Sequence, residues 1–228
     1  MSHRKLREVA PRYLAAAVVT LALAAITGCG SSGNGIADGT ATEALSAAFA
    51  AVEKAQSVHV ASSTLQGPVK ASLDADLTGQ GARGTISLLT YRMEVIRRGN
   101  TLYVKSTPEV YKRLGITQKI PQGAWAALPA GRAAQLASET DLTAEVRRII
   151  NTGGTITKGR TTTIGGQPVL ELKTEGKLFK GVLYLRTTGE PYPVKLEKQG
   201  RETGKATFTD WNTTSAPAAP TATVAAFE

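Results

Sequence analysis

Apolar and polar residues alternate with a period of two along two stretches of the chain, residues 57–106 and residues 155–211. Such alternation predicts β-strands with one covered face. In the segment KASLDADLT, for example, every second residue from Leu73 to Leu77 is apolar. Glycine, asparagine or proline separates the segments, and the Gly-Asn pair in RRGNTLYV is typical of a hairpin. We therefore expect about ten antiparallel strands.

Helical spacing of apolar residues occurs before and between these two stretches. The segment TATEALSAAFAAVEKAQS begins with Thr40, and Glu43 three residues later completes a capping-box pattern. In residues 108–151 the alternation stops, and a second amphipathic helix is expected to begin after Asp141 and to end before Gly153. Strands with helices gathered in two places predict an α+β fold, in which a large sheet curls and helices pack over one face.

The N-terminal segment has the three parts of a secretory signal peptide, which we place at residues 1–28. A basic head precedes an apolar run, residues 14–26, whose length of about 13 residues is less than the roughly 20 needed to span a membrane. The following letters, ITGC, resemble the lipobox of bacterial lipoproteins. This resemblance implies that Cys29 is alkylated with diacylglycerol and becomes the first residue of the mature chain. A buried structural cysteine is the alternative, but it fits poorly in a stretch of glycine and serine.

Composition divides the mature chain into three parts. Residues 29–39 predict a lipidated, flexible tether, because glycine and serine dominate them. Residues 40–212 predict one folded domain. Residues 213–228 contain few large apolar side chains and predict a disordered tail. Cys29 is the only cysteine of the chain, so no disulfide bond within the chain stabilises the domain.

The chain is basic, with 27 lysine and arginine residues against 18 aspartate and glutamate residues, a net charge of +9. Without residues 1–28 the surplus is about six positive charges, because that segment holds four basic residues and one acidic residue. For an extracytoplasmic protein, anionic lipid headgroups and envelope polymers are the available anionic partners, and nucleic acid is not. The scattered positions of the charges favour a solvated surface.

The sequence offers no catalytic or metal-binding motif. His59 is the only histidine after residue 28, and it lies in a predicted strand without a recognisable nucleophile motif. Asp74 and Asp76 are expected on the solvated face opposite Leu73 and Leu77. Histidine, cysteine and carboxylates do not occur at metal-ligand spacing. We therefore predict no catalytic residue, no metal and no cofactor, and a hydrolase that depends on His59 or a carboxylate ranks last.

The order of these features resembles the LppX and LprG lipoproteins of actinobacteria, which belong to the LolA- and LolB-like group of lipid carriers. The resemblance covers most of residues 29–212, from the lipobox through the helical insert to GVLYLRTTGEPYPVKLEKQG and GKATFTDWN. It implies an open half-barrel whose concave apolar face and covering helices enclose a cavity for acyl chains. It also implies a protein on the outer face of the cell membrane that carries lipids or glycolipids through the envelope, with an envelope transporter as a candidate partner.

The candidate cavity lining is the apolar side of the first run of strands together with the face of the insert helix as a lid. The same residues would look no different in a solid core. The main alternative is therefore an envelope scaffold or sensor lipoprotein that does not transport and that binds a protein or a wall polymer. The candidate lining residues are Val58, Val60, Leu73, Leu77, Ile86, Leu88, Met93, Val95, Leu102, Val104, Leu142, Val146, Ile149 and Ile150.

Overall fold

The computed structural model describes residues 33–226, which form one compact unit with a hydrophobic core. The predicted signal peptide (residues 1–28) and the predicted lipidation of Cys29 lie outside the described residues and stay predictions. None of the helices in the described part is long and apolar enough to cross a membrane. Because the unit has its own core, residues 30–228 are suitable for experiments in solution.

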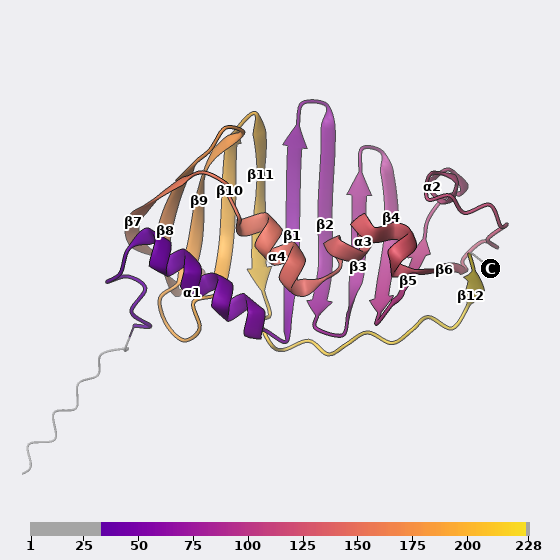
Figure 1. Cartoon of the computed structure of the whole chain (residues 1–228), viewed down its shortest axis with the longest axis horizontal. Helices are drawn as coiled ribbons and strands as arrows, with labels where there is room; N and C mark the ends of the chain where they lie inside the picture. The colour runs from indigo at the N-terminus through magenta and orange to yellow at the C-terminus, as the bar shows by residue number, and fades with distance from the viewer. Residues whose placement is uncertain (1–32, 227–228) are drawn as a thin grey trace, which may run out of the picture. The chain divides into compact units, whose positions relative to one another are not determined.

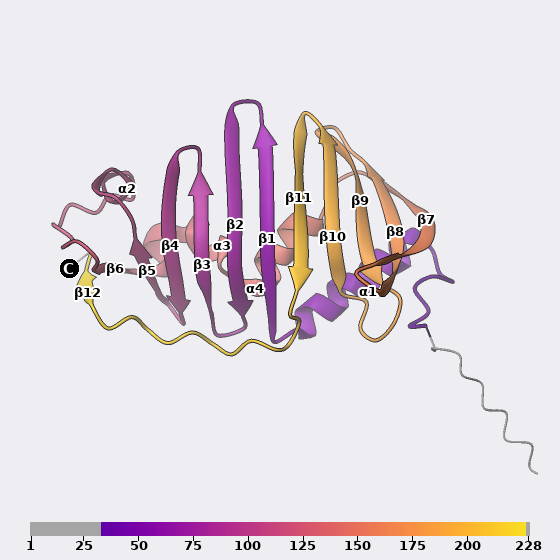
Figure 2. The ribbon, with the colours of Figure 1, turned by 180° about the vertical axis from the view of Figure 1, so that it is seen from behind.

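Twelve strands form a single sheet in the order β12-β6-β5-β4-β3-β2-β1-β11-β10-β9-β8-β7 (Figure 1). Neighbouring strands run antiparallel, except for β12 and β6, which run parallel. The outer strands β12 and β7 do not pair with each other, so the curled sheet stays open (Figure 2). The predicted α+β class with a curled antiparallel sheet is therefore confirmed. The strands are β1 (Ser57–Gln66), β2 (Val69–Thr78), β3 (Gly81–Leu88), β4 (Tyr91–Arg98), β5 (Thr101–Lys105), β6 (Trp125–Pro129), β7 (Thr155–Ile164), β8 (Gln167–Glu175), β9 (Phe179–Arg186), β10 (Pro193–Gly200), β11 (Glu202–Thr209) and β12 (Thr223–Ala225).

Three of the helices, α1, α3 and α4, lie over the same face of the sheet, in front of it in Figure 1 and behind it in Figure 2. The predicted caps are present: the Thr40 hydroxyl accepts from the backbone of Glu43, whose carboxylate accepts from the Thr40 backbone at 2.7 Å. Asp141 Oδ1 accepts from the Ala144 backbone at 2.9 Å. The helices are α1 (Ala41–Lys54), α2 (Pro108–Arg113), the 3₁₀ helix η1 (Ala130–Ala133), α3 (Ala134–Glu139) and α4 (Leu142–Ile150).

Each central strand has one apolar and one polar face, as its alternation predicts. Leu73 and Leu77 are buried under the helices, whereas Asp74 is exposed on the opposite side. We call these two sides the helix-covered face and the outer face. The register places Leu77 beside Val58 on β1 and Leu73 beside Ile86 on β3. Because in-register neighbours share a face, the apolar side chains form continuous rows across the sheet.

One strand, β6, lies inside the insert that the sequence predicts to be helical. The expectation for residues 108–151 was therefore wrong at this point. Only five residues long, β6 pairs with β5 and buries Ala126 and Leu128 beside Val104 and Leu102. The segment is too short to show a clear alternation, because it contains small residues and ends in Pro129.

The predicted disordered tail also differs from the structure, because residues 223–225 form β12. The backbone of Ala222 accepts from Trp125 at 2.9 Å, and the backbone of Ala226 donates to Ala127 at 2.8 Å. Ala226 is fully buried. The tail joins the domain through main-chain hydrogen bonds rather than large apolar side chains, and composition does not report such bonds.

The described end of the predicted flexible tether is docked on the domain. The Asn34 backbone donates to Thr187 at 2.7 Å, and Ile36 is buried in the core. The Lys158 ammonium donates to the backbone oxygens of Ala37 and Gly39, at 2.8 Å each. Residues 34–39 are therefore part of the folded unit. A short polar segment can be held in a fold by hydrogen bonds that involve its backbone.

Gly84 allows close approach of β3 and β2, and this predicts a stability difference between two glycines. A Cβ at Gly84 would overlap the Asp74 backbone oxygen and the Ala75 side chain, whereas a Cβ at Gly79 meets nothing within 4 Å. We expect Gly84→Ala to lower the free energy of unfolding by about 1–3 kcal/mol and Gly79→Ala to change it by less than about 0.5 kcal/mol. Urea denaturation measures both, and equal effects would contradict the close approach.

Candidate functional site

Thirteen of the fourteen residues predicted to line a cavity belong to one hydrophobic cluster, nine of them on the helix-covered face of the sheet and four on α4. Leu88 is the exception: it is 43% exposed, because it lies opposite Tyr91 at the hairpin end of β3. The cluster also contains apolar residues of α1 and α4, so the face is packed against its covering helices. The burial fits a lining and a solid core equally, and contact with a lipid stays a prediction.

Helix α4 covers the junction of the two strand runs as an amphipathic lid. Leu142, Val146, Ile149 and Ile150 are buried on its inner side. Full burial of four such side chains contributes about 6–12 kcal/mol. The helix is only nine residues long, so these contacts rather than its own hydrogen bonds hold it on the sheet.

Polar contacts hold α4 at its N-terminal end, through Arg97, and against α1, through Arg147. Arg97 on β4 donates to the Thr140 backbone oxygen at 3.0 and 3.2 Å and lies 3.5 Å from the Asp141 carboxylate. Arg147 pairs with Glu53 of α1. The pair between Arg147 and Glu53 is about half exposed, and such pairs contribute roughly 0–1 kcal/mol. The polar contacts therefore orient the helix more than they stabilise it.

Four charged residues lie where α4 faces β10 and β11, and we call them the rim cluster: Glu145, Arg148, Lys198 and Glu202. Glu145 is on the inner side of α4, 1% exposed, and accepts from Arg148 at 2.6 and 2.7 Å. Lys198 Nζ lies 2.6 Å from Glu202 Oε1, with both side chains about 15% exposed. Glu145 interacts electrostatically with Lys198, and Arg148 with Glu202. The apolar face thus ends in a nearly enclosed set of paired charges.

Burial raises the pKa of Glu145, because desolvation disfavours the carboxylate. The hydrogen bonds and charge of Arg148 and the charge of Lys198 act in the opposite direction, and Glu139 raises the pKa further. The same hydrogen bonds, which Arg148 donates to Glu145, raise the pKa of Arg148. Sequence reasoning missed this cluster, although the spacing of Leu196 and Lys198 already puts both on one face of a strand.

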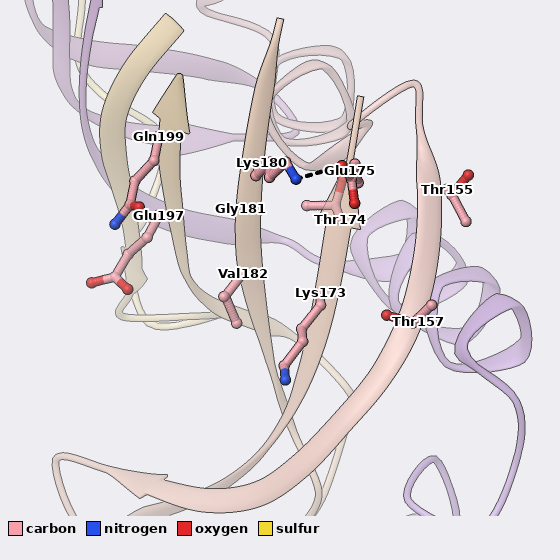
Figure 3. Close-up of a pocket in the computed structure, with 10 residues that line it drawn as sticks. All are labelled: Thr155, Thr157, Lys173, Thr174, Glu175, Lys180, Gly181, Val182, Glu197 and Gln199. Atoms are coloured by element: carbon pink, nitrogen blue, oxygen red, sulfur yellow. Dashed lines mark ion pairs between the residues drawn. The ribbon is translucent and has the colours of Figure 1, made fainter. Parts of the chain in front are cut away.

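The outer face has two polar hollows. The first, about 500 Å³, lies over β7 to β10 (Figure 3). Lys173, Lys180, Glu175 and Glu197 surround it, and Lys180 pairs with Glu175 at 2.6 Å. None of the predicted lining residues borders this hollow. Charged side chains and threonines surround it together with Val182, Gly181 and Gln199.

The second hollow, about 540 Å³, crosses the middle of the outer face. Ser63, Ser72 and Ser87 stand side by side across β1, β2 and β3, with Lys205 beside one end of the row and Arg92 beside the other. Neither cation forms an ion pair within residues 33–226. Of the predicted lining residues, only Leu73 borders this hollow.

His59, Asp74 and Asp76 meet on the outer face, which the sequence did not predict. His59 Nδ1 lies 2.9 Å from Asp76, and His59 Nε2 lies 3.8 Å from Asp74. Within the described residues the ring makes no hydrogen bond to a hydroxyl group. No group of three His, Cys, Asp or Glu in the described residues could hold a metal ion.

Comparison with known proteins places this architecture in one structural class. No family model and no curated protein matches the sequence. Among solved structures, the Mycobacterium tuberculosis lipoprotein LppX matches with a TM-score of 0.51 and 14% identity over 77% of this chain and 96% of that chain. A LolA superfamily protein from Nitrosomonas europaea matches with a TM-score of 0.29 and 13% identity over 78% of this chain and 96% of its own. The match to LppX confirms the predicted LppX-like resemblance at the level of the fold.

The raised pKa of Glu145 predicts how stability changes with pH. Between pH 4.5 and the raised value, the folded protein keeps the Glu145 proton while the unfolded chain releases it. The free energy of unfolding therefore contains a contribution that is full below pH 4.5 and is lost as pH rises through the folded pKa. Glu145→Gln removes this contribution, and we expect a flatter stability curve in urea denaturation from pH 4.5 to neutrality. An unchanged curve would show that Glu145 is ionised in both states.

Proposed function

We propose that the protein is a membrane-anchored lipid carrier of the cell envelope, which holds the acyl chains of a lipid or glycolipid between the helix-covered face and α1, α3 and α4. One observation carries this proposal. The apolar face of an open sheet with the LppX-like fold is covered only by short helices, rather than by a second sheet. Short helices on a continuous apolar face can separate from it without breaking the pairing of strands.

Loading requires α4 to lift, because the face is closed in the structure. A two-chain lipid has about 30 methylenes, which gain on the order of 25 kcal/mol when they leave water at about 0.8 kcal/mol each. This exceeds the roughly 6–12 kcal/mol contributed by the four buried side chains of α4. Acyl chains can thus replace the contacts of the lid. Transfer from a bilayer to such a lining is close to neutral, as a reversible carrier needs.

The ends of α4 allow this movement. Residues 151–154 connect α4 to β7 without regular structure, and Gly153 has a φ of 60°. Only glycine adopts this conformation without strain, so the connection can change direction there. Before α4, Thr140 and Asp141 separate it from α3. These two connections define α4 as a unit that pivots between its neighbours.

The docked segment at residues 34–39 keeps the carrier near its proposed anchor. Asn34 donates through its side-chain amide to the backbone oxygens of Arg186 and Gly189, at 2.9 and 3.0 Å. Five peptide units connect Cys29 to Asn34, which span at most about 18 Å. Diacylation of Cys29 would then hold the domain next to the outer face of the cell membrane, where its cargo is dissolved.

The proposal predicts that residues 30–228, purified from an envelope that contains the natural lipids, carry a bound lipid in native mass spectrometry. Leu77→Gln places a buried amide on the helix-covered face, where an acyl chain cannot satisfy it. We expect this variant to lose the lipid adduct by about tenfold or more. Organic extraction of the wild-type adduct identifies the cargo.

Thr85→Gln on the outer face of β3 is the matched control and should retain the adduct. Circular dichroism and the melting temperature show whether each variant folds. A bare polypeptide mass for the folded wild type, after mild purification, would contradict the carrier and favour a scaffold.

The second hollow favours one other function, an envelope scaffold that binds an anionic wall polymer. Its three serines offer hydroxyl groups, and the unpaired Lys205 and Arg92 offer positive charge at both ends. Asp74 also borders the hollow and opposes such binding.

This second function predicts that Lys205→Ser together with Arg92→Ser weakens binding to a polyanionic wall polymer by about tenfold at low salt. A Lys173→Ser variant in the first hollow is the control of comparable exposure. Binding that neither salt nor the double substitution changes would contradict a polymer site in this hollow.

A further inference from the structure

The rim cluster places a lysine on the side of the sheet that we propose to face lipid. On the helix-covered face of β10, Lys198 follows Leu196, which is fully buried. Its neighbours in register are Gly181 on β9 and Gly204 on β11, so no side chain stands directly beside it on either strand. The Lys198 side chain therefore lies over a strip formed by two glycines at the end of the apolar face.

The Lys198 ammonium has more N–H donors than it has hydrogen-bond partners in the protein. Within the described residues its only hydrogen bond goes to Glu202 at 2.6 Å, and the Phe179 ring lies 4.6 Å away. An ammonium has three N–H groups, so two of them have no protein partner. A buried charge with unmet hydrogen bonds is costly unless another group supplies them.

A second polar group in the same row also lacks a partner. Thr174 on β8 is 4% exposed, and its hydroxyl makes no hydrogen bond. Gly181 is the only residue between Thr174 and Lys198 along the row. A hydroxyl and an ammonium in one strip, both with free donors, match the oxygens of a phosphate or carboxylate group.

We propose that Lys198 binds the anionic headgroup of the carried lipid, and that the negative charge of the Glu145 carboxylate on the lid disfavours this anion while α4 is closed. This inference rests on the proposed lipid carrier. Glu145 is on the lid and pairs with Arg148 three residues along the helix, so both charges move away from Lys198 when α4 lifts. Glu202 remains on the sheet and holds the ammonium in position. The acyl chains then lie along the apolar rows, and the headgroup lies at the rim.

The arrangement predicts selection between headgroups. We expect residues 30–228 to extract phosphatidylglycerol from mixed vesicles about tenfold more readily than phosphatidylcholine, per molecule present, because only the former offers an anion without its own cation. The lipid that travels with the protein after separation from vesicles is counted by mass spectrometry.

Lys198→Met should lose this preference while it still extracts lipid, because the apolar stem is kept and the charge is removed. Lys195→Met is the matched control: Lys195 lies on the same strand, on the outer face, and pairs with Glu197. It changes the net charge equally and should keep the preference. Lys198→Arg should also keep it.

Glu145→Gln tests the inference in the opposite direction and does not depend on the folding of Lys198→Met. Loss of the competing carboxylate should raise the share of phosphatidylglycerol by about threefold to tenfold. Inorganic phosphate, added at the same concentration as the lipid, should not displace it, because the acyl chains supply most of the binding.

The outcomes separate the two proposals. If the folded wild type extracts no lipid from either vesicle, the carrier function fails and the headgroup site fails with it. If lipid is extracted without headgroup preference, or with a preference that Lys198→Met retains, the headgroup site alone is overturned. Displacement of the lipid by inorganic phosphate would assign the cluster to a free anion and would also overturn it.

Discussion

The pairing of β1 with β11 is the contact on which the rest of the structure depends. These strands come from opposite ends of the domain, yet eight pairs of residues are in register between them. Val60 lies beside Phe208, and Ser62 beside Ala206. The rows of side chains on the helix-covered face therefore continue from one half of the sheet into the other. Without this pairing the chain would contain two smaller sheets, each with an apolar face too small for the three covering helices. The continuous face exists because the two halves share a register.

An open sheet of this size must also protect its two edges, since unpaired strand edges can bind other chains. At one edge the short β12 pairs in parallel with β6, and its main-chain bonds cover the exposed side of that strand. At the other edge β7 contains an irregularity between Lys158 and Thr161, and Lys158 binds the backbone of the segment before α1. Segments that the sequence describes as tether and tail therefore complete the fold.

Sequence patterns predicted the faces of the sheet and the caps of the helices, because both depend on local spacing. Leu73 and Leu77 are buried opposite Asp74, and the Thr40 and Asp141 caps form as expected. Register and long-range hydrogen bonds do not follow from local spacing. Only the register of β1 and β2 brings His59 to Asp76, and only the pairing of β6 with β12 orders residues 223–225. Alternation also does not encode the volume between the sheet and its helices, which decides whether the apolar face lines a lipid cavity or packs as a solid core.

The position of Lys198 on the helix-covered face bears on whether that face is a solid core or a lining for lipid. A solid core gains nothing from an ammonium at this position, because desolvation offsets much of the attraction between buried charges. The rim cluster therefore contributes less to the closure of α4 than its four buried apolar side chains do. Glu145 and Arg148 both belong to α4, so the ion pair within the helix moves with it when α4 separates from the sheet. In the proposed carrier the rim cluster therefore offers little resistance to the opening of α4, and the apolar contacts of the lid are the ones that acyl chains must replace.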